Sequence, residues 1–293
     1  MWRDLRHFIQ ISRPINVTIS FVAFIVACFL ATRDLEFVYS LSFWGTALTI
    51  VVIAATGYWI NDVYDFRIDR INNPDKAIVN AMLSTKKVLT AYFVINLLIL
   101  GFSFLVIGIY GGRPQITFIN FLSVLLLYVY ASYLKRTGVA GNLTISFLIA
   151  LVLILAYYLT HKLNMALIWS IIFAFEITLI REITKDVEDI KGDLAFKLKT
   201  LPIQIGIKAT KRILIILYVV FLLSTYMPFI YYAYWKADWN IMYLILSGAI
   251  VQIPTIWILR LLIKSSNPKE LGEHSGYLKY VMLTGMITLF FLT

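Results

Sequence analysis

Residues 61–69 read Asn-Asp-Val-Tyr-Asp-Phe-Arg-Ile-Asp, which places three aspartates within eight residues at the end of a long apolar run. These aspartates are Asp62, Asp65 and Asp69, and their spacing occurs a second time in the chain. The second set comprises Asp186, Asp189 and Asp193, each 124 residues after its counterpart. The sequence therefore predicts two copies of one acidic motif, located at equivalent positions in the two halves of the chain.

The composition identifies the chain as an integral membrane protein. Hydrophobic residues make up 60% of its 293 residues and charged residues only 14%, whereas soluble domains average about 45–50% apolar and about 25% charged. The mean hydropathy is +0.83. No long polar segment interrupts the apolar runs, so we expect residues 1–293 to form a single membrane-embedded domain. The single cysteine, Cys28, excludes an internal disulfide.

Apolar runs separated by polar breaks predict an all-α fold with nine transmembrane helices, because a helix needs about 20 apolar residues to cross the hydrocarbon core. The predicted spans lie near residues 14–32, 40–60, 87–110, 115–134, 142–160, 165–182, 211–234, 240–263 and 275–293. Pro228 and Pro254 fall inside two of these spans and predict kinks.

The distribution of Lys and Arg predicts the orientation. The N-terminus and the loops after the second, fourth, sixth and eighth spans hold 22 of the 26 basic residues. Retention of Lys and Arg on the cytoplasmic side of the plasma membrane explains this bias, and also the net charge of +10 without nucleic acid. Both acidic sets then face the cytoplasm, where we expect them to form one site. Four spans separate them, which predicts two parallel four-helix repeats plus a ninth helix.

The acidic sets predict a metal site. Positions i, i+3 and i+7 of a helix share one face, and Asn61 extends the first stripe. Two carboxylates about 5 Å apart repel by roughly 3 kcal/mol at an effective dielectric near 20, so six of them require cations. Oxygen ligands without nearby His or Cys suit Mg²⁺ bridging to a phosphate-bearing substrate. The predicted ligands are Asn61 and the six aspartates.

Other polar residues are candidates for binding the substrate, because Arg grips phosphate oxygens bidentately and Lys binds them as a point charge. The candidates are Arg70, Lys76, Lys135, Arg181, Lys185 and the amide of Asn16. The surrounding helices, rich in aromatic and aliphatic residues, suit a long isoprenoid tail. We expect residues 71–85 to cap the site against water. For Asn96, Asn120 and Gln252 we expect hydrogen bonds between helices.

The two acidic sets resemble the motifs of the UbiA superfamily of intramembrane prenyltransferases. Residues 61–69 match its first motif, NDxxDxxxD, and residues 186–193 match its second, DxxDxxxD. The resemblance covers essentially the whole chain. It implies nine helices around a central cavity, two Mg²⁺ ions bridging the aspartates to an allylic diphosphate, and transfer of the prenyl group to a lipophilic acceptor.

Within the superfamily, residues 181–193 and 130–135 are most similar to the archaeal enzymes that prenylate geranylgeranylglyceryl phosphate. This similarity implies that Tyr130 joins the substrate site and that the hydroxyl of this ether-lipid precursor accepts a geranylgeranyl group. At residues 76–77, Lys-Ala stands where Arg-Pro is usual in the family.

Other functions also use clustered carboxylates in a membrane. An aromatic prenyltransferase of quinone biosynthesis, acting on a naphthoate, hydroxybenzoate or homogentisate, would use a similar cavity. A divalent-cation transporter usually places its site near the bilayer midplane, on broken helices. An alcohol phosphotransferase needs Gly at the position of Phe66. We expect the lipid bilayer as a partner, and neither nucleic acid nor an obligate protein partner.

Overall fold

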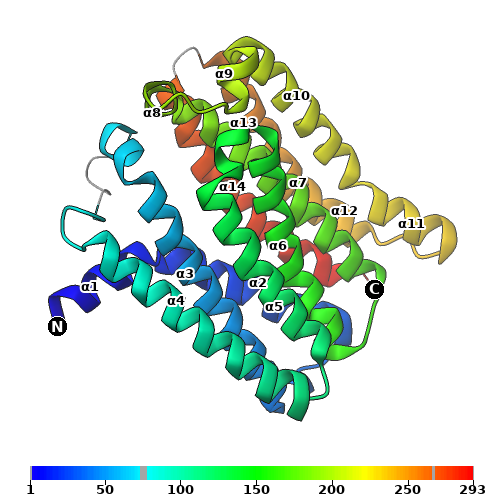
Figure 1. Cartoon of the computed structure of the whole chain (residues 1–293). Helices are drawn as coiled ribbons and strands as arrows, with labels where there is room; N and C mark the ends of the chain where they lie inside the picture. Colours follow the sequence, from blue (N-terminus) through cyan, green and yellow to red (C-terminus); the bar gives the residue numbers. More distant parts are fainter. Residues whose placement is uncertain (1, 73–77, 266–267, 293) are drawn as a thin grey trace. The chain divides into compact units, whose positions relative to one another are not determined.

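The structure is a computed structural model that describes residues 2–72, 78–265 and 268–292, and all its regular elements within these ranges are helices (Figure 1). The predicted all-α class is confirmed. The contacts divide the chain into two compact units, Met1–Lys135 with Leu151–Lys162 and Arg136–Ala150 with Leu163–Thr293. The long helix α6 (Val139–Thr160) contributes its first half to the second unit and its second half to the first.

The first unit is built around α3 (Leu41–Asn72), which contacts α2, α4 and α5. Its helices are α1 (Trp2–Ile11), α2 (Pro14–Thr32), η1 (Glu36–Tyr39), α4 (Thr85–Phe102), the π-helix η3 (Ser103–Tyr110) and α5 (Pro114–Ser132), with the first two residues of η4 (Leu134–Thr137). The 32 residues of α3 extend about 48 Å at about 1.5 Å per residue, more than the ~30 Å hydrocarbon core. Helix α3, which carries the first acidic set at its end, is therefore longer than such a core.

Polar side chains fasten α3 to its neighbours inside the apolar region. Asn120 Nδ2 donates to Thr49 Oγ1 over 3.1 Å and to Ser103 Oγ over 2.9 Å. Thr56 Oγ1 donates to Asn96 Oδ1 over 3.2 Å. The predicted helix–helix role of Asn96 and Asn120 is confirmed, because without such partners these buried amides would be costly.

The second unit is built around α7 (Met165–Glu188), which packs on α10 and α14. Its other helices are α8 (Ile190–Ala195), α9 (Leu201–Ile205), α10 (Ile207–Ser224), α11 (Met227–Trp235), α12 (Ile241–Ser247), the π-helix η5 (Gly248–Gln252), α13 (Ile253–Lys264), α14 (Pro268–Thr288) and η6 (Leu289–Phe291). The core between these helices is apolar and includes the fully buried side chains of Leu214, Tyr218 and Leu262.

Both predicted kinks correspond to interruptions of helical geometry. Pro228 lies at the start of α11, directly after the break that ends α10, and Pro254 follows the π-helix η5. Gln252 Nε2 donates to Thr225 Oγ1 over 3.0 Å, and Tyr226 Oη donates to Gln252 Oε1 over 2.8 Å. The predicted role of Gln252 in joining helices is therefore confirmed.

Seven helical segments of the described chain are long and apolar enough to cross a membrane. They are Pro14–Thr32, Leu41–Asn72, Thr85–Tyr110, Pro114–Ser132, Val139–Thr160, Ile207–Trp235 and Ile241–Lys264. They correspond to seven of the nine predicted spans, while the predicted spans at 165–182 and 275–293 fall on α7 and on α14 with η6. The count of nine stays a prediction.

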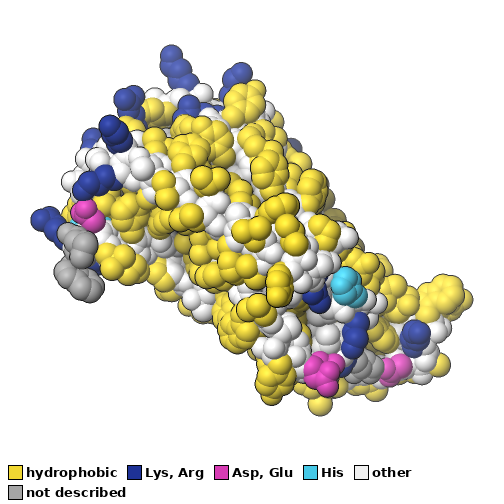
Figure 2. All heavy atoms as spheres, turned by 60° about the horizontal axis from the view of Figure 1, so that its bottom comes forward, with side chains coloured by type: hydrophobic (Ala, Val, Ile, Leu, Met, Phe, Trp, Pro, Cys, Tyr) yellow, Lys and Arg dark blue, Asp and Glu magenta, His cyan; other side chains and the backbone are white. Residues whose placement is uncertain are grey.

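Apolar side chains cover much of the face drawn in Figure 2. On α4, Leu97 and Leu98 have exposed fractions of 75% and 67%, which suits contact with lipid rather than water. With the seven apolar segments, this surface identifies an integral membrane protein.

A close approach of α3 and α5 leads to a stability prediction. A Cβ atom on Gly57 would lie 2.9 Å from both methyl groups of Leu127, so we expect Gly57→Leu to lower the free energy of unfolding by about 1–3 kcal/mol through overpacking. Thermal unfolding in detergent measures the change. Gly101→Leu is the matched control, because nothing lies within 4 Å of that position. Equal melting temperatures for the two variants would contradict the packing role.

Candidate functional site

The first acidic set lies at the end of α3, and two of its carboxylates are buried. The exposed fraction is 8% for Asp62 and 3% for Asp65, while Asp69 is half-buried. An ionised carboxylate in such a place is strongly destabilising unless it is paired with a cation or accepts hydrogen bonds. Both buried carboxylates have a cation as partner.

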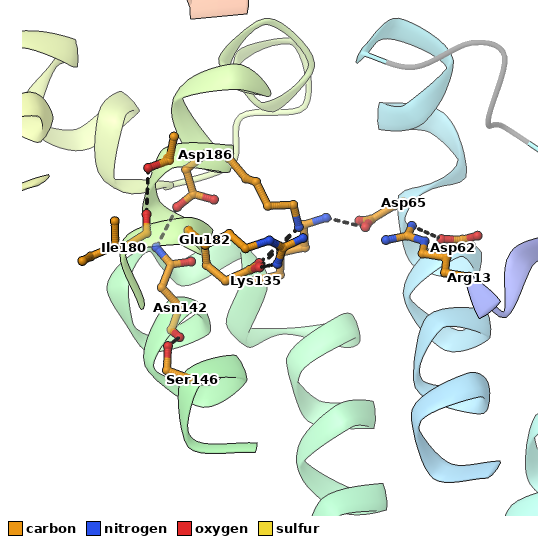
Figure 3. A network of polar contacts seen from close by, with 12 residues as sticks. Arg13, Asp62, Asp65, Lys135, Asn142, Ser146, Ile180, Glu182 and Asp186 are labelled. Carbon is orange, nitrogen blue, oxygen red and sulfur yellow. Dashed lines mark hydrogen bonds and ion pairs between the residues drawn. The ribbon is translucent and has the colours of Figure 1, made fainter. Parts of the chain in front are cut away.

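Arg13 is the partner of Asp62: its Nη2 donates to Asp62 Oδ1 over 2.7 Å (Figure 3). Arg13 joins α1 to α2 in the left-handed conformation, with φ 50, which a non-glycine residue adopts rarely. Trp59 Nε1 donates to Ser12 Oγ over 2.8 Å, and the Trp59 ring packs 4.8 Å from that of Phe8. These contacts hold the α1–α2 junction against α3, one turn before Asp62.

Lys135 is the partner of Asp65: its Nζ donates to Asp65 Oδ2 (Figure 3). Lys135 lies in η4, directly after α5. Burial acts to lower the pKa of the Lys135 ammonium, but Asp65 together with Tyr130 and Asp69 raises it, and the net result is a pKa well above the ordinary value. A raised pKa in the folded state means that the charged Lys135 ammonium stabilises the fold at neutral pH, and that this contribution is lost as the pH rises through the raised pKa.

The Arg13 guanidinium behaves in the same way. Burial acts to lower its pKa, while the carboxylates of Asp62 and Asp69 raise it, and the net shift is upward. Arg13 therefore stays protonated and positively charged at every physiological pH.

Asn61 adds an oxygen without a partner. Its Oδ1 atom is buried and has no hydrogen-bond partner among the described residues. A buried polar atom left in this state costs about 1–3 kcal/mol, a cost that a ligand at this position would remove. Asn61 thus fits the predicted role of a metal ligand beside Asp62.

The other candidates of the first unit lie at varied distances from this end of α3. Arg70 is exposed, with its guanidinium 6.0 Å from the Phe66 ring. Asn16 is half-buried in the first turn of α2, and Tyr130 is half-buried on α5, five residues before Lys135. Lys76 lies outside the described residues, as does part of the predicted cap at 71–85.

The described end of that predicted cap is packed into the core of the first unit. Ile78, Val79 and Leu83 are buried in one apolar cluster with Ile11 and Trp59. Residues 78–83 are therefore anchored next to α1 and α3, through the same contacts that hold the α1–α2 junction.

In the second acidic set, Asp186 has an amide as partner. Asn142 Nδ2, on the first half of α6, donates to Asp186 Oδ2 over 2.8 Å, and Ser146 Oγ donates to the Asn142 carbonyl oxygen over 2.8 Å (Figure 3). Asp193, on the short helix α8, has an exposed fraction of 3%. This set therefore also holds buried carboxylate oxygens.

Asp189 corrects the prediction that the second set lies on one regular helix. Its ψ is 3, far from the helical value near −42°, so α7 ends at Glu188 and α8 begins at Ile190. The prediction assumed a constant 100° per residue, and one residue outside helical geometry changes that phase. The Asp193 N–H still donates to the Asp189 carbonyl oxygen over 3.1 Å, so the chain continues close to its helical path.

Arg181 and Lys185 contact an acid of their own helix. Glu182, with an exposed fraction of 7%, accepts from Arg181 Nη1 and, over 3.3 Å, from Lys185 Nζ. The Arg181 Nε atom is buried and has no hydrogen-bond partner among the described residues. Phosphate binding by these two cations stays a prediction.

Two residues that contact the acidic sets were not assigned to them from sequence. Arg13 looks in the sequence like an ordinary cytoplasmic charge, and its partner Asp62 is 49 residues away. Asn142 is a polar position next to an apolar run, which marks it only as unusual. Their ion pair and hydrogen bond depend on which helices pack together.

The donor chemistry fits a hard metal ion, because both sets offer carboxylate oxygens and Asn61 Oδ1 is unpaired. Within the part of the chain that the structure describes, no three His, Cys, Asp or Glu side chains are gathered closely enough to hold a metal. In the first set, the Asp62 carboxylate contacts Arg13 and the Asp65 carboxylate contacts Lys135. The two carboxylates do not converge on one point.

The fold and these side chains define the class as a helical integral membrane protein with two acidic helix ends. The sequence profile of the UbiA prenyltransferase family matches residues 20–272. The chain belongs to this family, as its two motifs indicated.

Two relatives illustrate the similarity. A Methanosphaera stadtmanae protein named digeranylgeranylglyceryl phosphate synthase is 30% identical over 284 residues, which cover 96% of this chain and 97% of the relative. A protein of the same name from Saccharolobus solfataricus is 34% identical over 246 residues, or 83% and 81% of the two chains.

Solved structures share the fold. One, of digeranylgeranylglyceryl phosphate synthase in membranes, matches with a TM-score of 0.71 at 24% identity and covers 99% of both chains. A UbiA homologue from Archaeoglobus fulgidus, bound to DMAPP and Mg²⁺, has a TM-score of 0.61 at 13% identity, covering 96% of this chain and 98% of that one.

The buried ion pair predicts a large effect of Lys135→Met. Because the variant leaves the Asp65 carboxylate buried without its cation, we expect the free energy of unfolding to fall by about 3 kcal/mol. Chemical or thermal unfolding in detergent measures it, and adding Asp65→Asn should restore most of the loss.

The control is Lys87→Met, which breaks a solvent-exposed pair with Asp4 whose side chains are 62% and 40% exposed. Exposed pairs contribute less than about 1 kcal/mol. If both single variants lose the same small amount, the Lys135 pair does not have the assigned importance.

Proposed function

We propose that this protein transfers a geranylgeranyl group from geranylgeranyl diphosphate to the free hydroxyl of geranylgeranylglyceryl phosphate. The observation that carries the proposal is the similarity, over nearly the whole chain, to relatives named digeranylgeranylglyceryl phosphate synthase. Membership of the UbiA prenyltransferase family defines the reaction class, and the synthase name of these relatives supports the choice of acceptor.

Each acidic set would supply oxygen ligands for Mg²⁺. In the first set these are Asn61, Asp62, Asp65 and Asp69, and in the second they are Asp186, Asp189 and Asp193, with two ions as the expected number. Bound Mg²⁺ would draw negative charge from a diphosphate. The Archaeoglobus fulgidus homologue bound to DMAPP and Mg²⁺ supports this assignment.

In the reaction, the bond between the allylic carbon and the diphosphate oxygen breaks, and its electron pair leaves with the diphosphate. The acceptor hydroxyl oxygen then bonds to that carbon and releases its proton to the departing diphosphate. Lys135, Arg70 and Lys76 stabilise the charge that develops on the leaving group. Exclusion of water prevents hydrolysis of the cation to the prenyl alcohol.

Binding occurs at the cytoplasmic face of the plasma membrane, and the N-terminus lies on the same side. The basic residues concentrated on one side of the predicted spans support this orientation. The isoprenoid tails of both substrates enter the apolar region of the nine-span bundle. No protein partner is needed for this reaction.

The acceptor is tested directly with purified protein, Mg²⁺ and geranylgeranyl diphosphate. We expect an ether product with geranylgeranylglyceryl phosphate and none with hydroxybenzoate, naphthoate or homogentisate. Mass spectrometry of the extracted lipids measures the products. Prenylation of an aromatic acid, with no ether product, would assign the protein to quinone biosynthesis instead.

Substitutions in each acidic set test the metal site. Asp65→Ala and Asp189→Ala should each lower turnover by about a thousandfold, equivalent to about 4 kcal/mol, while the purified protein remains folded by circular dichroism. Asp4→Ala is the control, because Asp4 is an exposed acid that pairs with Lys87. Full activity of either motif variant would contradict the two-set site.

A further inference from the structure

Building on the proposed function, we infer that Arg13 and Lys135 are exchangeable counter-ions of the first acidic set. They hold the Asp62 and Asp65 carboxylates until a metal ion binds there, and then move to the oxygens of the diphosphate. Arg13 thereby becomes a diphosphate-binding residue, and Lys135 acts on the aspartates as well as on the substrate.

The geometry assigns one cation to each buried carboxylate. Arg13 Nη2 lies 2.7 Å from Asp62 Oδ1, and Lys135 Nζ donates to Asp65 Oδ2 (Figure 3). These are the two most buried carboxylates of the first set, with exposed fractions of 8% and 3%. The two cations come from the α1–α2 junction and from η4, so neither is a local partner on α3.

A metal ion would share these carboxylates with the cations. Mg²⁺ would bind a carboxylate oxygen at about 2.0–2.1 Å, which would place a donor on the same oxygen about 4 Å from the ion. A divalent and a monovalent charge at 4 Å repel by about 8 kcal/mol at an effective dielectric of 20. We therefore expect a metal that binds Asp62 Oδ1 or Asp65 Oδ2 to displace the cation from that oxygen.

The diphosphate is the natural destination for the displaced cations. It arrives with several negative charges beside the metal, and Arg can bind two phosphate oxygens at once. The Arg13 side chain is 38% exposed and its guanidinium lies 4.9 Å from the centre of the Tyr58 ring. The guanidinium can therefore change its hydrogen-bond partner by rotating next to this ring. Lys135 is 24% exposed, and its flexible stem allows a similar movement.

The exchange makes metal and diphosphate binding cooperative. A metal alone must break the ion pairs without compensation, whereas a metal that arrives with the diphosphate gives both cations a new anion. Removing one cation should then strengthen binding of the metal alone and weaken binding of the diphosphate. A residue that merely stabilises the fold, or merely supports the metal site, would not produce opposite changes.

The test uses the purified full chain, Mn²⁺ as the metal and inorganic pyrophosphate as the anion. Electron paramagnetic resonance measures free Mn²⁺, and calorimetry measures pyrophosphate binding at saturating Mn²⁺. For Lys135→Met and Arg13→Gln we expect Mn²⁺ alone to bind about fivefold more tightly, or better, and pyrophosphate to bind weaker by a similar factor. Lys87→Met, which removes an exposed cation of the same unit, should change neither value.

Two results would overturn the inference: unchanged or weaker Mn²⁺ binding in both variants, or unchanged pyrophosphate binding. Because Lys135→Met is expected to be less stable, each variant is measured below its melting temperature, and Arg13→Gln provides an independent case. Asp65→Asn distinguishes the two proposals. If the wild-type protein binds no Mn²⁺ and Asp65→Asn changes nothing, the proposed metal site is wrong, whereas Mn²⁺ binding that needs Asp65 but ignores the cations refutes only the exchange.

Discussion

Burial of carboxylates at the end of α3 is the constraint on which the first unit depends. An ionised carboxylate loses several kcal/mol of hydration on burial, and Asp62 and Asp65 are both almost fully covered. The chain compensates with two cations brought from elsewhere. To supply Arg13, α1 docks on Trp59 and the chain reverses in a left-handed conformation. To supply Lys135, α5 ends where η4 can reach α3.

The two acidic sets share a spacing but not a supporting environment. In the first set cations neutralise the carboxylates, whereas Asp186 accepts from the amide of Asn142 and the neighbouring Arg181 and Lys185 contact Glu182.

Polar residues within the apolar segments form hydrogen bonds with one another between helices. Asn120 bonds Thr49 and Ser103, and Gln252 bonds Thr225 next to the break between α10 and α11. These bonds leave the helix surfaces apolar, as lipid and an isoprenoid chain require. Charge is instead concentrated at the helix ends, where an anionic diphosphate group can be bound while its tail stays in apolar surroundings.

Composition and spacing were sufficient to predict an all-helical membrane protein, most of its spans and the two aspartate sets, because hydrophobicity and helical periodicity are local properties of a sequence. Partner choice was not predictable. Arg13 and Asp62 are 49 residues apart, and Lys135 and Asp65 are 70 residues apart. From the sequence alone, many other Lys and Arg residues are equally good candidates for pairing with each carboxylate. The break at Asp189 and the capture of Arg181 by Glu182 were equally hidden. Only packing decides such contacts, since the cost of a buried charge depends on which neighbours the folded chain brings within hydrogen-bond distance.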